Sequence, residues 1–321
     1  MKRLGLFVCL CFYISLAGAQ QNTAYNKYIF NNLYINPAYA GYKGDLYLQS
    51  FYKSQWTGFS GAPASFALAA DGAINSLKVG LGLIFSSDNI GAQSYVSAYG
   101  NYAYHIQMGE DPDTRLSFGL GLGFIQNGID GNKLNGVENG DSTIPLTFES
   151  VLLPDARAGV MYSDRGFFAG FSMDNIIAQY FKKDNSIFAI VPKPHYYLTF
   201  GGLVALNEDT KLKPSVLFSD YQAGLKSVDV GLAVCFVNRL WLGATYRADI
   251  TDASMPGAGL QKDNSITATI SVVATDNIRL GYAFDYSTTA LGNTNYGSHE
   301  LSLGIYLGHK KAPFSSDRRN F

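Results

Sequence analysis

The chain has 321 residues and almost balanced charge, with 24 Lys and Arg against 25 Asp and Glu. Aromatic residues make up 14% of the chain and charged residues 15%, where a soluble domain typically has about 25% charged residues. This charge balance argues against a nucleic-acid-binding protein, and the aromatic content argues against disorder. Because mean hydropathy is only +0.02, apolar and polar residues are finely mixed, which excludes a bundle of membrane-spanning helices.

The first predicted element is a cleaved signal peptide over residues 1–19. It has a basic start, an apolar core over 4–16 that is too short to span a bilayer, and a small-residue cleavage site at Ala17-Gly18-Ala19. Two of the three cysteines lie in this peptide, which leaves Cys235 in the mature chain. We therefore expect an exported protein without an internal disulfide, in which Cys235 is a small buried side chain.

The mature chain alternates apolar residues with small or polar ones, which is the period-2 pattern of β-strands. Residues 115–126 are the clearest case, because Leu and Phe there alternate with Gly and Ser. Such runs predict about fourteen strands of this kind. They are expected at 45–54, 64–71, 77–86, 94–106, 115–126, 155–163, 167–174, 195–206, 211–219, 227–236, 240–249, 265–274, 278–287 and 298–308.

Two architectures fit many alternating strands, namely a soluble sandwich and a transmembrane barrel. Charges within the strands fall on the small-residue face, as a barrel lumen requires, but a sandwich would show the same parity. They are Lys78, Arg157, Asp229, Arg247, Arg279, Asp285 and Glu300. Glycines decide between the two, because they gather on the same face, where they would weaken a soluble sheet. A closed barrel has no unpaired edge and tolerates them. We therefore predict an all-β fold, an antiparallel outer-membrane β-barrel of about 14 strands after a cleaved signal peptide.

Loop lengths support the barrel. Connections after even-numbered strands are short, and those after odd-numbered strands are mostly longer, with the longest at 127–154 and 175–194. Outer-membrane barrels have short periplasmic turns and longer extracellular loops, so both termini are expected in the periplasm. The predicted organisation is a signal peptide at 1–19, a periplasmic N-terminal segment at 20–44, a barrel at 45–308 and a periplasmic tail at 309–321.

No catalytic or metal-binding motif stands out. The four histidines are scattered, and no nucleophile elbow of the G-x-S-x-G type is present. Residues 130–141 are rich in oxygen ligands but lack the spacing of a calcium hand, so they form a solvated loop or a weak calcium site. We expect no enzymatic activity and no cofactor.

Three segments carry a family resemblance: Asn36-Pro-Ala-Tyr-Ala-Gly41, Gln55-Trp-Thr-Gly-Phe-Ser-Gly-Ala-Pro63 and Ser298-His-Glu-Leu-Ser-Leu-Gly304. Together they make the mature chain resemble the PorP/SprF family of outer-membrane proteins of the type IX secretion system in Bacteroidetes. The resemblance implies a barrel in the cell outer membrane that acts in protein secretion, cell-surface attachment or gliding motility. It also implies as partners type IX secretion components, secreted substrates with a C-terminal secretion domain and, for some members, a periplasmic peptidoglycan-binding protein.

Three segments are candidates for contacting a partner or plugging the barrel. The first motif is such a segment or a plain periplasmic turn, and the second is a partner contact or ordinary loop structure. Loop 175–194 carries more apolar surface than a solvated loop needs, so it should cover the barrel mouth or dock a partner. The candidate residues are Asn36, Pro37, Ala38, Tyr39, Gly41, Gln55, Trp56, Gly58, Phe59, Tyr180, Phe181 and Phe188.

Three functions compete: a secretion-associated barrel that scaffolds or anchors translocated proteins, a passive or lipophilic-solute channel, and a barrel enzyme. The chain shows no catalytic set, and the resemblance favours the first. A fourteen-stranded barrel is wider than its own small inward side chains can fill, so something should occupy the lumen. The N-terminal segment 20–44 and the long loops are the candidates.

Overall fold

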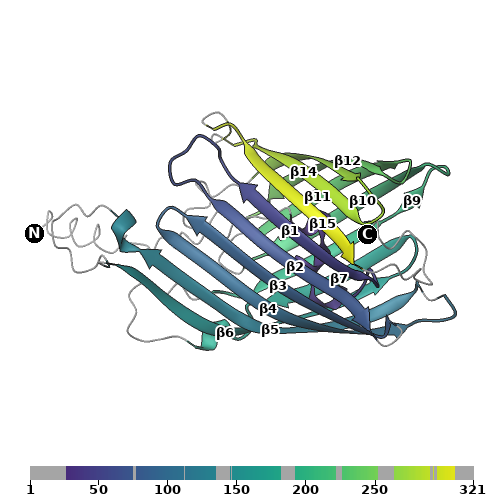
Figure 1. Ribbon diagram of the computed structural model, residues 1–321, viewed down its shortest axis with the longest axis horizontal. Coiled ribbons are helices and arrows are strands. Elements are labelled where there is room, and N and C mark those ends of the chain that lie inside the picture. Colours follow the sequence, from purple (N-terminus) through teal and green to yellow (C-terminus); the bar gives the residue numbers. More distant parts are fainter. Residues whose placement is uncertain are drawn as a thin grey trace, which may run out of the picture.

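The computed structural model describes residues 27–74, 77–111, 113–134, 145, 147–181, 192–221, 226–251, 264–289, 292 and 295–307. They form a closed antiparallel β-barrel, as the sequence predicted (Figure 1). Strand β1 (Leu46–Ser54) closes the ring by pairing with β15 (Ser298–Leu307). The signal peptide at 1–19 and the tail at 309–321 lie outside the described residues.

The remaining strands follow one another around the ring in chain order. They are β2 (Ala64–Ile74), β3 (Val79–Ile90), β4 (Gln93–Gln107), β5 (Arg115–Asp130), β6 (Phe148–Ser163), β7 (Phe167–Asp174), β8 (His195–Gly202), β9 (Val204–Ala205), β10 (Thr210–Asp220), β11 (Lys226–Phe236), β12 (Leu240–Asp249), β13 (Ser265–Val273) and β14 (Ile278–Ser287). Both β8 and β9 pair with β10, so they are one strand interrupted at Leu203, and the barrel has 14 strands.

Short helical turns accompany the strands. Helix α2 (Lys27–Phe30), η1 (Asn32–Tyr34) and η2 (Pro37–Tyr39) precede β1, while η4 (Gly131–Lys133) follows β5 and η5 (Ala178–Tyr180) follows β7. Within the described part of the chain, no helix is long and apolar enough to cross a membrane.

The two faces of the strands have the predicted character. Leu83, Leu120 and Leu122 point outward and are 66%, 64% and 70% exposed. Their neighbours of opposite parity, such as Asn101 and Arg157, are buried toward the lumen. Lys78 is an exception to the predicted in-strand charges, because it lies exposed in the turn before β3.

The β5–β6 hairpin is longer than predicted. Its register pairs Asp130 with Phe148, so both ends of the expected loop 127–154 are strand, and the hairpin projects beyond its neighbours (Figure 1). The expected loop ended at Pro154, and proline has no N–H for the ladder of a central strand. Strand β7 pairs with β6 only from Ala158 onward, so Pro154 lies where β6 has no ladder partner on its β7 side among the described residues.

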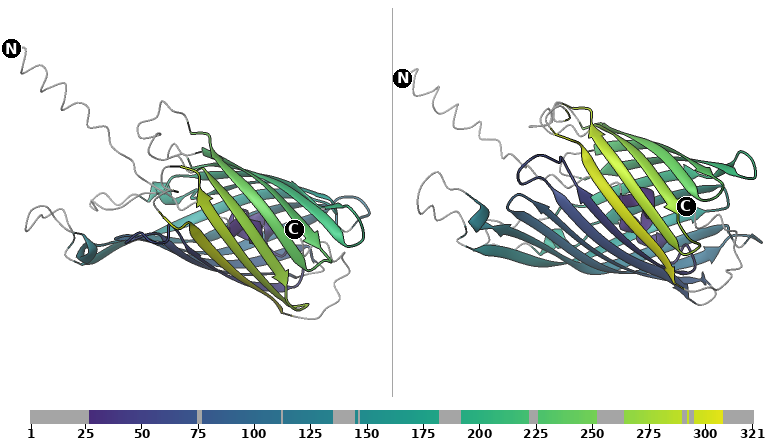
Figure 2. Two further views of the ribbon diagram at one scale, coloured as in Figure 1. Left: turned by 90° about the horizontal axis from the view of Figure 1, so that it is seen from above. Right: turned by 45° about the horizontal axis from the view of Figure 1, so that its top comes forward.

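The barrel has two ends, which we call the turn end and the loop end. The turn end carries the short connections such as 164–166 and 237–239, and Leu46 of β1 pairs there with Leu307 of β15. The loop end carries the connections that precede β8 and β15. The described part of the expected periplasmic segment 20–44, residues 27–44, lies inside the barrel, as the purple ribbon in Figure 2 shows. We call residues 27–44 the plug.

Candidate functional site

The plug has its own compact local structure. It contains two single turns of 3-10 helix, and an asparagine caps each of them: Asn31 accepts from the Leu33 amide at 3.0 Å and Asn36 from the Ala38 amide at 2.9 Å. Pro37 suits the first position of its turn, because the missing N–H there has no helical partner to lose. Gly41 then adopts a φ of 70°, in the left-handed region that glycine favours. The first family motif is therefore a capped turn within the plug.

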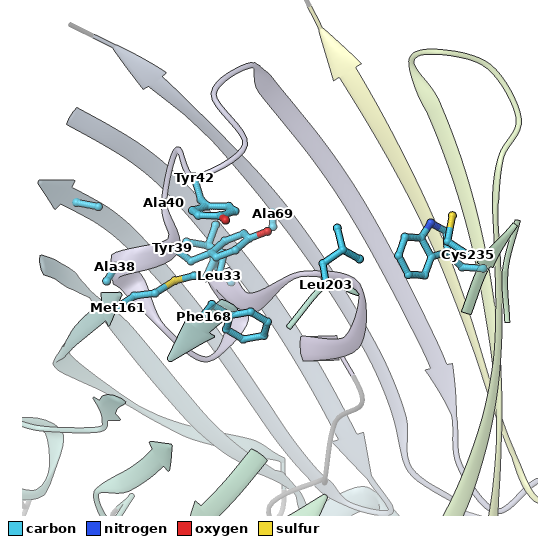
Figure 3. Packing of buried hydrophobic residues seen from close by; sticks show 13 residues of the cluster. Leu33, Ala38, Tyr39, Ala40, Tyr42, Ala69, Met161, Phe168, Leu203 and Cys235 are labelled. Atoms are coloured by element: carbon cyan, nitrogen blue, oxygen red, sulfur yellow. The ribbon is translucent and has the colours of Figure 1, made fainter. Parts of the chain in front are cut away.

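Apolar packing holds this structure in the lumen. Leu33, Ala38, Tyr39 and Ala40 are completely buried, and the Tyr39 and Tyr42 rings stack with 5.0 Å between centroids (Figure 3). Barrel side chains from several strands complete the cluster. They are Ala69, Ile84, Ala103, Met161, Phe168, Leu203, Cys235 and Trp241. Cys235 is thus a buried side chain, as expected.

One wall of the barrel, β6 and β7, binds the plug through polar groups. Asn36 Nδ2 donates to the Val160 carbonyl at 3.1 Å, and Ser172 Oγ donates to the Ile35 carbonyl at 2.6 Å. Arg157 Nη2 donates to the Tyr34 carbonyl at 2.9 Å. The last two bonds satisfy plug carbonyls that lie buried in the lumen, and the first ties a plug side chain to the backbone of β6.

Further anchors lie on other strands and span the barrel from end to end. Near the turn end, Gly41 N donates to Asp71 Oδ2 at 3.0 Å, and His105 Nε2 lies 3.0 Å from the Ala40 carbonyl. Toward the loop end, the Tyr28 hydroxyl donates to Asp229 Oδ2 at 3.0 Å. The plug therefore runs along the lumen from near the loop end to the turn end, where β1 begins.

Lumenal glycines make room for the plug. A Cβ atom on Gly80 would overlap the Ala40 carbonyl, and one on Gly119 would overlap the Ala38 backbone. One on Gly159 would overlap the Asn36 side chain. Sequence reasoning used the glycines only to choose a barrel over a sandwich, and it missed that several of them face a filling segment.

Ion pairs line the lumen around the plug. Lys53 Nζ lies 2.8 Å from Glu300 Oε1 across the β1–β15 seam, and both side chains are fully buried. Arg247 binds Asp229 through two nitrogens at 2.8 and 2.7 Å. Arg157 Nε lies 2.9 Å from Asp174. Each pair neutralises a buried charge, so this part of the lumen is both filled and electrically balanced.

The second family motif lies apart from the plug, at the loop end. Thr57 and the segment before β15 bind each other: Thr57 N donates to the Gly297 carbonyl and Tyr296 N to the Thr57 carbonyl, both at 2.9 Å. Gly58, at φ 102°, lies against the Tyr296 ring. The loop that holds Gln55, Trp56, Gly58 and Phe59 thus extends the closing seam beyond the strands. Gln55 is buried and Phe59 is exposed, and a partner role for these residues stays a prediction.

The third candidate segment starts with an anchored turn. Asp155 Oδ1 accepts from the amides of Ile177 and Ala178 at 3.2 and 3.1 Å, while its other oxygen accepts from the Tyr99 hydroxyl. The two candidate aromatic side chains that follow remain exposed to solvent: Tyr180 is 77% and Phe181 50% exposed. Phe188 lies outside the described residues.

The described residues offer no obvious centre for chemistry. Among them, no group of three or more His, Cys, Asp and Glu side chains is placed to hold a metal ion. His105 is engaged between the plug and Ser117, whose hydroxyl lies 2.7 Å from Nδ1. The arrangement defines an outer-membrane β-barrel whose lumen is filled by its own N-terminal segment.

The comparisons with known proteins identify the family. The family model described as type IX secretion system membrane protein PorP/SprF matches residues 17–305 of the sequence. The chain belongs to this family, as its motifs predicted. It is therefore an outer-membrane barrel associated with type IX secretion components and membrane lipid. No curated protein matches the chain.

Solved structures share the fold at low sequence identity. A Pseudomonas aeruginosa FadL homologue is 8% identical with a TM-score of 0.51, over 85% of this chain and 93% of its own. The CymD monoaromatic hydrocarbon channel is 9% identical with a TM-score of 0.54, over 87% and 93%. At this identity the likeness concerns the barrel fold alone.

Proposed function

We propose that this protein is a scaffold of the type IX secretion system, which anchors secreted or cell-surface proteins at the outer membrane without conducting them through its own lumen and without catalysis. Membership of the PorP/SprF family supports the association with type IX secretion. The filled lumen supports the absence of conduction, because the plug and the surrounding ion pairs occupy the path that a translocated chain would need.

The proposal includes an orientation. The short connections at the turn end suit the periplasm and the longer ones at the loop end suit the cell surface. On this assignment the end of β15 faces the periplasm, where a peptidoglycan-binding protein could dock, and Tyr180 and Phe181 face the surface. Residues before 27 lie outside the described part, so the position of the mature N-terminus stays a prediction. The first described residues lie toward the loop end.

In this proposal the partner is a secreted protein with a C-terminal secretion domain, held at the loop end. Tyr180 and Phe181 are exposed aromatic side chains on an anchored turn. Exposed aromatics on a well-fixed backbone are typical anchors of protein–protein interfaces.

Two measurements on the same purified sample test the proposal. A tagged barrel from solubilised outer membrane should co-purify with secretion components and with a surface protein, and Tyr180→Ala with Phe181→Ala should reduce the surface protein while leaving the secretion components. In planar bilayers the wild-type barrel should show little conductance.

A stable, open conductance without any co-purifying protein would instead favour the lipophilic-solute or passive channel.

The orientation of the barrel is tested separately with a membrane-impermeant thiol reagent on intact cells. Tyr180→Cys should react and Asp276→Cys, exposed at the turn end, should not. The wild type is the control, because its Cys235 is buried.

A further inference from the structure

One edge of strand β6 is only partly covered by its neighbours in the ring. Strand β5 pairs with β6 along its whole length, from Phe148 to Ser163, whereas β7 pairs with it only from Ala158 to Ser163. In the part of the chain that the structure describes, residues 148–157 therefore have no strand beside them on the β7 side (Figure 1). We call residues 148–154 of this stretch the free edge.

The chain leaves β6 at a defined point. Asn175, directly after β7, has a φ of 58°, a left-handed conformation that turns the backbone. The Ile176 amide then donates to the Ala156 carbonyl at 3.0 Å, and Asp155 holds η5 next to the strand. Because these contacts direct the chain off β6 beside Ala156, the free edge starts just beyond them.

The backbone bonds at its two ends show which groups the free edge presents. The Thr147 carbonyl accepts from the Gly131 amide at 3.3 Å, and the bonding residues of an antiparallel ladder alternate. Odd-numbered residues of β6 therefore bond with β5, and even-numbered residues turn toward the β7 side, in agreement with the bond at Ala156. Pro154 falls on the β7 side, where its missing N–H costs the β5 ladder no bond. In the described chain, the groups that face this side without a strand partner are the N–H and C=O of Phe148, Ser150 and Leu152 and the C=O of Pro154.

Apolar packing holds the free edge from behind. Leu153 points inward between the edge positions and is buried in a cluster with Ile125 of β5, Tyr99 of β4 and Ala178 of η5. The edge groups are therefore fixed in strand conformation before any partner arrives, which lowers the entropy cost of binding.

An open strand edge suits an aqueous surface and not a membrane. An unpaired backbone group is strongly destabilising in hydrocarbon, so the free edge belongs outside the lipid at the loop end, where the β5–β6 hairpin projects beyond its neighbours (Figure 1). It presents donors and acceptors that repeat every second residue, or about every 6.8 Å. The backbone of another extended chain matches this pattern, whereas lipid tails do not.

We propose that the free edge binds an extended segment of the surface protein, which adds to β6 as a further antiparallel strand. Backbone bonds give such strand addition its affinity, and contacts of alternate side chains give its specificity. Phe148 and Leu152 are exposed on the edge, and Tyr180 and Phe181 are exposed on the turn that Asp155 holds beside it. The segment should therefore carry apolar side chains at alternate positions. The inference rests on the proposed function, because it states how the partner at the loop end is held.

A second copy of the barrel in the same membrane does not fit the free edge. Two copies with the same orientation have β6 strands that run in the same direction, from the loop end to the turn end. Their identical edges therefore cannot form an antiparallel ladder. A strand from a protein outside the membrane has no such constraint.

Proline substitution tests the edge without disturbing the β5 ladder. Ser150→Pro and Leu152→Pro remove N–H groups on the free side only, as Pro154 does, so both variants should assemble, which heat-modifiable migration on gels verifies. The probe is a short, fluorescein-labelled peptide of alternating Thr and Val, titrated with the purified barrel in uncharged detergent while its fluorescence anisotropy is measured. Each proline variant should bind it about tenfold more weakly than the wild type. Ser150→Ala, the matched control, keeps the N–H group and should bind as the wild type does.

Methylation of the probe tests whether its backbone is recognised. A peptide with every amide N-methylated keeps its apolar side chains but has no backbone donor, so it should not bind. A peptide with alternate amides methylated keeps one intact edge and should still bind.

Co-purification separates this inference from the proposed function. If the wild type and both proline variants retain the surface protein equally, the inference fails and the proposed function stands. A wild type that retains no surface protein contradicts the proposed function, and the peptide titration still decides whether the edge accepts a strand.

Several results of the titration would overturn the inference. They are no binding by the wild type, equal binding of the fully methylated peptide, and equal affinity of the wild type and both proline variants. Binding only after removal of residues 183–190 would also contradict it, because the chain's own loop would then occupy the edge. A barrel dimer that Leu152→Pro separates would assign the edge to a second copy instead.

Discussion

The two faces of β5 obey different rules. On the outer face, Leu120 and Leu122 are among the most exposed apolar side chains and meet one uniform apolar medium. On the inner face, Gly119 lies against the plug backbone and Gly121 against Arg157. The side chain at an outward position therefore needs only to be compatible with an apolar medium. The side chain at an inward position must fit one particular neighbouring group. Substitutions on the outer face should tolerate any apolar side chain, and those on the inner face should be sensitive to single atoms.

The largest change in stability is expected at the buried ion pair between β1 and β15. Lys53→Met should reduce the free energy of unfolding by about 3–5 kcal/mol, because it leaves Glu300 buried without its partner. Urea unfolding monitored by tryptophan fluorescence measures the change. The double variant with Glu300→Leu is the control and should recover most of the loss. If the double variant is as unstable as Lys53→Met alone, the pair does not act as a neutral unit.

The outer face should respond to charge and not to shape. Leu120→Arg should cost about 2–4 kcal/mol, because an arginine at mid-strand would face lipid. Assembly yield and unfolding in lipid vesicles measure it. Leu120→Phe keeps the side chain apolar and should assemble as the wild type does. Equal losses for the two variants would show that shape also matters on this face.

A single methyl group should distinguish the faces. Gly119→Ala should cost about 1–3 kcal/mol, because its Cβ overlaps the plug backbone, and the displaced plug should raise conductance in planar bilayers. Gly100→Ala is the matched control on the outer face, where the nearest atoms would lie 3.9 Å from the new Cβ. Unchanged conductance in Gly119→Ala would mean that the plug accommodates the methyl group in place.

The smallest effect concerns the plug's own turn. Asn36→Ala should cost about 1 kcal/mol from the lost cap alone, and it also removes the bond to Val160. Asn36→Ser keeps an acceptor for the Ala38 amide and loses the contact with β6, so comparing the two unfolding free energies separates these contributions. A loss in Asn36→Ser as large as in Asn36→Ala would assign the role to the β6 contact.

The same contrast explains what the sequence could predict. Outward rows such as that of Leu120 repeat one kind of residue every second position, so strand number, faces and barrel class followed from periodicity. Strand ends were harder to predict. The ladder pairs Pro154 with Phe124 and Phe148 with Asp130, so both strands of this hairpin extend into the expected loop 127–154.

The candidate site was harder to predict because its contacts are distant in sequence. Asn36-Pro-Ala-Tyr-Ala-Gly41 was recognised as special, but its placement depends on glycines in β3, β5 and β6 that carry no signal alone. A pairing of these glycines with the motif could have been suspected from the width of a fourteen-stranded barrel.

Closure of the ring also constrains how the molecule can be made. The plug precedes β1 in the chain, and the seam joins Leu46 to Leu307, the widest sequence separation of any strand pair in the described barrel. Pairing such distant residues carries a large loop-closure entropy and slows folding. The contacts that fix the plug, such as that of Tyr28 with Asp229, also join residues far apart in the chain, so filling the lumen and closing the ring carry the same kind of kinetic cost. Because the plug directly precedes β1, closing β1 on β15 encloses residues 27–44 within the ring.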